Sequence, residues 1–234
     1  MSAAAAAGDT SGSVWAELRL ADAGDVPHIH RLIRQMAEFE RLTHLFSATE
    51  ASLASSLFPS PSPPPPFLSF TVLILDLLPH PPSSPSNPSN PSPFPPISRR
   101  IDLPSPVPDP DAAAFASSRG GGGVVAGFLL CFPNYSTFLA KPGIYVEDIF
   151  VRAPWRRRGL GRMMLAAVAA QAARMGMGRV EWCVLDWNAA AIDFYKQMGA
   201  DVLPMWRICR LAGPALDAYA YAEAEEEEQP QQEN

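Results

Sequence analysis

The sequence contains little that would suit a metal site, a disulfide framework or a membrane anchor. Its 234 residues include 3 cysteines and 4 histidines. Cys131, Cys183 and Cys209 are scattered and outside any Cys-x-x-Cys spacing, which is typical of reduced thiols and argues against zinc. His28 and His30 lie two residues apart on an expected helix and therefore face different ways, so we expect no metal. No run of about 18 apolar residues occurs, so we expect no membrane span.

A surplus of positive charge is also missing, and this argues against a nucleic-acid partner. The net charge is −6, but six acids lie in the C-terminal tail, so 24 − 6 leaves 18 acids against 18 Lys and Arg. We expect residues 222–234 to form an acidic disordered tail. Residues 1–13 lack the basic residues of a signal or transit peptide, and we expect a disordered N-terminal tail. A cytoplasmic location is the expectation, and a nuclear one is compatible with it.

Proline is abundant, but most of it lies in one place. Of the 26 prolines, 19 fall between Pro59 and Pro110. Within this stretch 67–78 is proline-free and rich in β-formers, which predicts a strand. We expect 79–123 to be a disordered Pro/Ser-rich insertion in a domain spanning 14–213. We also expect deletion of 79–119 to leave activity and melting temperature largely intact. A proline-rich ligand for an SH3- or WW-like partner is the alternative.

Apolar periodicity outside the insertion predicts alternating strands and helices. We expect a first helix capped by Asp25 and ending near Arg41, and a second with a capping box from Ser47 to Glu50. The other predicted elements are strands at 14–20, 124–132, 145–151 and 180–186, helices at 160–176 and 188–198, and one or two closing strands in 201–211. This order indicates an α/β (α+β) fold with a mixed sheet.

The segment that carries chemistry runs from Tyr145 to Gly161. A mainly apolar strand leads into three arginines, then Gly-Leu-Gly, and then a helix. Glycines let the backbone approach a ligand, the helix N-terminus adds partial positive charge, and arginines add forked donors. The pattern predicts a pyrophosphate site. A P-loop would need Gly-Lys-Ser/Thr, and a dinucleotide fingerprint would need a third glycine where Met164 stands. On its own, the string also fits a basic turn that caps a helix.

The surrounding motifs resemble the GNAT superfamily of acetyl-CoA-dependent N-acetyltransferases. Arg156 to Gly161 resembles that family's Arg/Gln-x-x-Gly-x-Gly/Ala motif. Further segments resemble the diamine (spermidine/spermine) branch and its plant members, which acetylate tyramine, ornithine and diamines: 39–46, 132–136, 145–151, 186–188, 194–196 and 199–200. The resemblance implies a mostly antiparallel central sheet with flanking helices and a homodimer.

The resemblance also implies roles for particular residues. Glu147 would take the amine proton through a water, and Tyr195 would protonate the departing thiolate. The acetyl-CoA contacts would be Ile149, Phe150, Val151, Arg156, Arg157, Arg158, Gly159, Leu160, Gly161, Arg162, Asn188, Ala189, Ala190 and Ala191. Glu40, Asp148 and Asp186 would line the amine site, although simple salt bridges are as compatible with the two aspartates.

One departure from the polyamine-specific members concerns the acceptor. They place an acid and a Trp where this chain has Thr137 and Leu139, and fewer acids weaken recognition of a second cationic amine. We therefore expect a small-molecule amine other than spermine or spermidine. Acetylation of protein lysines or N-termini, and a non-catalytic acetyl-CoA-binding protein, are the alternatives.

Overall fold

The computed structural model describes residues 12–59, 64–82 and 93–226. The chain divides into two compact units, Met1–Cys183 and Val184–Asn234. No described helix combines the length and the apolar character that crossing a membrane requires.

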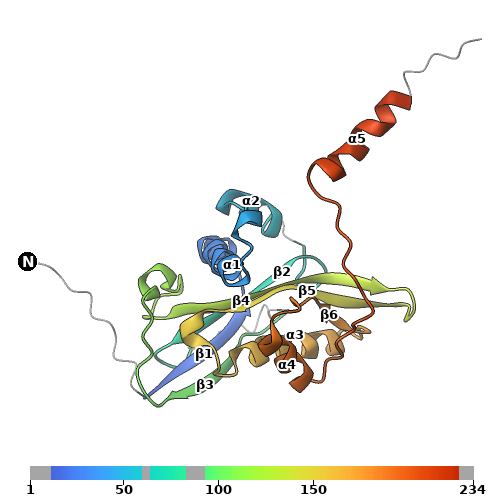
Figure 1. Ribbon diagram of the computed structural model, residues 1–234. Helices are drawn as coiled ribbons and strands as arrows, with labels where there is room; N and C mark the ends of the chain where they lie inside the picture. Colours follow the sequence, from blue (N-terminus) through green and yellow to red (C-terminus); the bar gives the residue numbers. More distant parts are fainter. Residues whose placement is uncertain (1–11, 60–63, 83–92, 227–234) are drawn as a thin grey trace, which may run out of the picture. The chain divides into compact units, whose positions relative to one another are not determined.

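A six-stranded sheet forms the centre of the first unit (Figure 1). Its order is β3-β1-β2-β4-β5-β6, and every neighbouring pair is antiparallel except β5 and β6, which run parallel. The strands are β1 (Gly12–Leu20), β2 (Thr71–Leu78), β3 (Ile97–Leu103), β4 (Val124–Ser136), β5 (Lys141–Val151) and β6 (Val180–Trp182). The mixed, mostly antiparallel sheet predicted from the sequence is confirmed.

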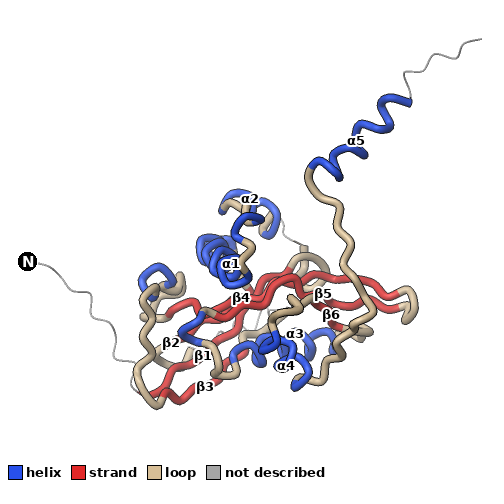
Figure 2. The backbone as a smooth tube through the Cα atoms, in the orientation of Figure 1, coloured by secondary structure: helices blue, strands red, loops and turns tan. Residues whose placement is uncertain are grey.

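Helices cover both faces of this sheet (Figure 2). The first two, α1 (Val26–Glu40) and α2 (Glu50–Leu57), lie over one face, and α3 (Leu160–Arg174) lies over the other. Ile29 and Leu32 of α1 belong to the buried cluster that also contains Phe128 of β4 and Phe150 of β5. The cap of α2 is Thr49, in a capping box with Ser52, and not Ser47 as expected, so the helix begins two residues later.

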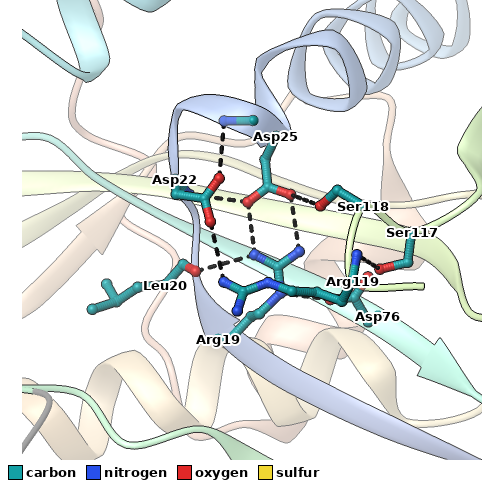
Figure 3. Close-up of polar contacts among 9 residues, drawn as sticks. Arg19, Leu20, Asp22, Asp25, Asp76, Ser117, Ser118 and Arg119 are labelled. Carbon is teal, nitrogen blue, oxygen red and sulfur yellow. Dashed lines mark hydrogen bonds and ion pairs between the residues drawn. The ribbon is translucent and has the colours of Figure 1, made fainter. Parts of the chain in front are cut away.

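A buried ion-pair cluster joins β1, β2 and the turn before α1 (Figure 3). Arg19 donates to both carboxylate oxygens of Asp25, at 2.6 and 2.9 Å, and its Nε donates to Asp76 at 2.6 Å. Asp25 is the N-cap residue of α1, as expected, but its side chain makes no capping hydrogen bond because its carboxylate pairs with Arg19. Asp22 instead caps the short 3-10 helix that precedes α1.

Much of the expected disordered insertion is folded. Residues 97–103 are proline-free between Pro96 and Pro104, and they pair with β1 from Gly12↔Leu103 to Leu18↔Ile97. Phe115 lies in a short 3-10 helix and is 2% exposed. An edge strand needs partners on one side only, and β1 offers a free edge, so the surrounding prolines do not prevent pairing. The remaining part, 83–92, lies outside the described residues.

The second unit contains α4 (Ala189–Gln197) and α5 (Pro214–Glu226). The expected strand at 180–186 ends at Trp182, and the closing strands expected in 201–211 are absent, since those residues have no regular structure. A strand requires a neighbour for its backbone groups, and the described residues of this unit include no other strand. The helix α5 extends into the expected disordered tail as far as Glu226, because Ala and Glu are strong helix formers.

The two predicted termini overlap only in part with the described residues. Residues 1–11 and 227–234 lie outside them. Gly12 and Ser13, assigned to the N-terminal tail from the sequence, belong to β1.

Candidate active site

A β-bulge lies at two adjacent acidic residues in the middle of β5, Glu147 and Asp148. Leu130 pairs with Asp148, whereas the next residue of β4, Cys131, pairs with Val146. Glu147 is therefore the extra residue of β5, and a bulge changes the direction in which a side chain points. Regular alternation would send Glu147 and Asp148 to opposite faces of the sheet, so the bulge matters for their joint use.

An acidic environment surrounds Asp148. Burial raises the pKa of this carboxyl to about 7, and the nearby carboxylates of Glu147 and Glu40 add to the effect. Burial also raises the pKa of Glu40, which ends α1. The fold thus brings Glu40 close to Asp148 and Glu147, two predicted residues that lie far from it in the sequence. An acidic site that contains a carboxyl group with a pKa near neutrality suits the binding and deprotonation of a cationic amine.

Beyond the bulge, β5 loses its neighbour on one side. The parallel pairing with β6 runs from Ile144↔Val180 to Val146↔Trp182. From Asp148 to Val151, β5 pairs with β4 but with no other described strand. Ile149, Phe150 and Val151, the residues expected to contact the acyl-pantetheine arm, lie along this open edge. Unpaired backbone groups at a sheet edge can pair with an extended ligand.

The turn from β5 into α3 has the form of an anion-binding loop. Arg157 and Gly159 adopt positive φ angles of 63° and 73°. No side chain caps the N-terminus of α3, and Met163 is the first residue whose N–H reaches a helical acceptor, Gly159 O at 3.0 Å. The N–H groups of the first turn, from Leu160 to Arg162, are thus available to an anion, which the positive end of the helix favours. The loop fits the pyrophosphate of acetyl-CoA.

The arginines of this loop divide into two kinds. Arg156 donates through Nε to Val151 O at 2.7 Å, and its guanidinium stacks 4.3 Å from the ring of Phe39. Arg158 donates to Pro154 O at 3.0 Å and to Arg156 O at 2.9 Å. These two arginines shape the loop. Arg157 and Arg162 are exposed, as an arginine that meets phosphate must be.

The remaining predicted residues belong to the second unit. Asn188 caps α4, and its side-chain oxygen accepts from Ala191 N at 3.3 Å. Tyr195 is buried in the same helix, with its ring 5.2 Å from that of Phe194. Asp186 precedes the helix, and Ala189 to Ala191 form its first turn. The roles assigned to these residues from the sequence stay predictions.

Two contacts at the loop were not anticipated from the sequence. Arg99 of β3 donates to Arg158 O at 2.8 Å, and Asp109 accepts hydrogen bonds from Arg152 and Trp155. Both Arg99 and Asp109 come from the insertion. The available signal was the run Ile97–Leu103, which contains no proline and in which Ile97, Ile101 and Leu103 fall on one face of a strand, interrupted only by Arg99. Its proline-rich surroundings obscured this signal.

Comparison with known proteins agrees with this geometry. The model of the acetyltransferase (GNAT) family matches residues 80–200. The chain belongs to the GNAT acetyltransferase family. Among curated GNAT relatives, L-ornithine N5-acetyltransferase of Arabidopsis thaliana is 51% identical, over 89% of this chain and 90% of its own. Tyramine N-feruloyltransferase 4/11 of Nicotiana tabacum is 36% identical, over 88% and 92%.

A more distant relative and a solved structure extend the comparison. Thialysine N-epsilon-acetyltransferase of Mus musculus is 29% identical over 86% of this chain and 92% of its own. An integron cassette protein of V. cholerae superposes with a TM-score of 0.55 at 16% identity, covering 88% of this chain and 97% of that one. The latter likeness shows the fold alone. This GNAT-family chain is an N-acetyltransferase, and the family uses acetyl-CoA as its co-substrate.

Proposed function

We propose that this enzyme transfers the acetyl group of acetyl-CoA to the primary amine of a small molecule of the ornithine, tyramine or diamine type. The observation that carries the proposal is the pair of carboxylates at the β5 bulge, Glu147 and Asp148, with Glu40 near them. The names of the curated relatives, an ornithine acetyltransferase and a tyramine acyltransferase among them, support the same class of acceptor.

The carboxylates of Glu40, Glu147 and Asp148 can bind the protonated amine and remove its proton, which the reaction requires. An alkyl amine has a pKa near 10, like Lys, so at neutral pH only about one molecule in a thousand carries the free lone pair. Generating that free amine costs roughly 4 kcal/mol unless a base takes the proton. Asp148 and Glu40 would hold the ammonium, and Glu147 would receive its proton, directly or through one water.

Bound acetyl-CoA supplies an acetyl group activated as a thioester. In the proposed mechanism, the first turn of α3 with Arg157 and Arg162 binds the phosphates, and the open edge of β5 aligns the arm. Tyr195, from α4, would donate a proton to the departing sulfur, because a phenol is a competent donor at neutral pH. This division of roles needs no nucleophilic cysteine.

The pH dependence of amine use tests the role of Asp148. As pH rises through about 7, its carboxyl ionises and attracts the ammonium, so we expect kcat/KM for the amine to rise. Because the free amine also increases with pH, the measurement is the ratio of wild type to Asp148→Asn, which should grow roughly 5–10-fold from pH 6 to 8. A ratio that stays constant over this range would remove Asp148 from the amine site.

The pH dependence of the stability of wild type and Asp148→Asn gives an independent check on the raised pKa of Asp148. The folded protein keeps a proton on Asp148 that the unfolded chain releases near pH 4, so this group lowers stability as pH rises from about 4 to about 7. The Asp148→Asn variant should lack that decline, which denaturant titrations at several pH values would measure.

The acceptor class itself is tested by a panel of amines. Ornithine, tyramine, putrescine, spermidine and a histone peptide would each be assayed with acetyl-CoA, with Tyr195→Phe as the impaired control. We expect the small amines to give the highest kcat/KM, and Tyr195→Phe to lower kcat about 10²–10⁴-fold with little change in CoA affinity. Preference for the peptide would replace the proposal with protein acetylation.

We further propose a homodimer, which the family resemblance supports, and a cytoplasmic location, with which a nuclear one is compatible. Light scattering on the purified chain would measure the oligomeric state, and a monomeric mass with full activity would contradict the dimer.

A further inference from the structure

The proline-rich insertion reaches the pyrophosphate loop through one arginine. Arg99 lies on β3, and its Nη2 donates to the carbonyl oxygen of Arg158, 59 residues further along the chain, at 2.8 Å. Its guanidinium also lies against Gly159. A Cβ built on that glycine would come within 3.2 and 3.3 Å of the two terminal nitrogens of Arg99. The absence of a side chain at Gly159 therefore leaves room for a guanidinium directly beside the start of α3.

The pairing of β3 explains why Arg99 points to this place. Side chains alternate along a strand, so Arg99 shares one face of β3 with Ile101 and Leu103. Ile101 and Leu103 are 8% and 5% exposed, and they anchor this face against the body of the unit. The register with β1, in which Arg99 is opposite Ala16, then sets how far along the strand Arg99 lies.

A second contact holds the other end of the loop. Asp109, also from the insertion, accepts from Arg152 Nη1 at 2.8 Å and from Trp155 Nε1 at 2.9 Å. Arg152 directly follows β5, and the ring of Phe115 lies 3.9 Å from its guanidinium carbon. The insertion therefore contacts the loop between β5 and α3 at both ends: Asp109 contacts its beginning, and Arg99 contacts its end.

Arg99 has donors to offer a ligand. A guanidinium carries five N–H groups, and the contact with Arg158 O uses one of them. The residue is exposed, whereas Arg156 and Arg158 direct their donors into the loop. Together with Arg157 and Arg162, Arg99 gives the N-terminus of α3 a third exposed cation, and it is the one whose position a strand determines. A forked cation held in place suits a phosphate oxygen.

We propose that Arg99 is an additional CoA-binding residue, supplied by the proline-rich insertion, whose guanidinium binds the phosphates of CoA at the start of α3. This inference rests on the proposed use of the Arg156–Gly161 loop for the pyrophosphate. It gives the insertion a direct part in cofactor binding.

The test measures the Kd of CoA by titration calorimetry on the full chain. Arg99→Ala should raise the Kd about 10–30-fold, as expected for the loss of a charge-assisted hydrogen bond. The matched control is Arg100→Ala, which removes the same charge one residue away. Alternation places Arg100 on the opposite face of β3, where it is exposed and pairs with Asp102. Its Kd should stay within about 2-fold of wild type.

Two further measurements separate phosphate binding from support of the loop. In Arg99→Gln, the amide can still donate to Arg158 O but carries no charge, so we expect a Kd as high as for Arg99→Ala. Acetyl-pantetheine, a thioester that lacks the nucleotide and the pyrophosphate, should have the same KM in wild type and Arg99→Ala to within about 2-fold. Recovery of wild-type affinity in Arg99→Gln would overturn the inference and leave Arg99 as a support only.

The outcomes also distinguish this inference from the proposed function. If wild-type protein does not bind CoA, the proposed function fails and the inference fails with it. If wild type binds CoA and Arg99→Ala binds it equally well, the inference alone fails. Thermal unfolding of each variant in the absence of CoA shows whether it is folded, and the Arg99→Gln variant keeps the comparison available if Arg99→Ala is not.

Discussion

Two buried arginines, Arg19 and Arg152, form ion pairs of the same geometry with aspartates in different parts of the molecule. Arg19 in β1 is 4% exposed, and Arg152 after β5 is 1% exposed. Each presents both terminal nitrogens to both oxygens of one aspartate, Asp25 and Asp109 respectively. Such bidentate pairs fix geometry as well as contributing energy.

The two clusters differ in the origin of their partners. Arg19 meets Asp25, six residues later, and Asp76 on the adjacent strand, so elements of the central fold alone complete it. Arg152 meets one carboxylate and one aromatic ring, Asp109 and Phe115, and both come from the proline-rich insertion. The first cluster joins elements of the central sheet and α1. The second binds the proline-rich insertion to the start of the loop between β5 and α3. A long insertion can thus become part of an active site through a single buried ion pair.

Replacing Arg19 by Met should have the largest effect on stability. The change leaves Asp25 and Asp76 buried without a cation, and breaking a buried pair in this way costs about 3–5 kcal/mol. Denaturant unfolding would measure the loss. The control is Arg34→Met, because Arg34 is 57% exposed on α1 and its salt bridge spans 3.8 Å. A loss for Arg19→Met no larger than that of the control would show that the cluster is not needed for the fold.

Replacing Asp109 by Asn should have a smaller effect on stability but a second effect on cofactor binding. Arg152 keeps its contacts with Val125 O and Phe115, so we expect a loss of about 2–3 kcal/mol. Because Arg152 and Trp155 begin the loop, the Kd of CoA should also rise roughly 3–10-fold. The folded fraction of Arg19→Met should bind CoA normally, and this contrast is what separates the two clusters.

The matched control for this variant is Asp111→Asn, two residues away. Asp111 is exposed and bonds to Gln35 at 3.1 Å, so the same chemical change should leave both stability and CoA affinity within experimental error. If Asp109→Asn lowers stability but leaves the Kd of CoA unchanged, the insertion supports the fold without positioning the loop.

The smallest effect on stability is expected at the exposed salt bridge between Arg119 of the insertion and Asp22, next to the Arg19 cluster. Arg119 donates to Asp22 at 3.1 Å, but the two side chains are 53% and 59% exposed. Exposed pairs contribute little, so Arg119→Ala should change the free energy of unfolding by less than about 0.5 kcal/mol. A loss above about 1 kcal/mol would mean that the surface contact, and not Asp109, attaches this end of the insertion.

The sequence predicted the central fold well and the insertion poorly. The strands around the site, the helix α3 and the loop between them were recoverable because apolar periodicity and Gly/Pro signals act over a few residues. The strand β3 was missed because its proline-rich surroundings indicated disorder. The closing strands in 201–211 were expected from apolar periodicity, which does not show whether a neighbouring strand is present to pair with them. The bulge at Glu147 also depends on the register with β4, which no local pattern reveals.

By itself, the sequence determined the chemistry of this protein: a run of arginines and glycines between a strand and a helix, and an adjacent pair of acids in that strand. These features are local, and side chains close in sequence keep their order in any fold that forms them. Only the tertiary structure decided which distant groups meet them, Glu40 near Asp148, Asp109 at Arg152 and Arg99 at Gly159. Such meetings depend on which sheet edge is free and on the register of pairing, and both arise only when the whole chain has packed.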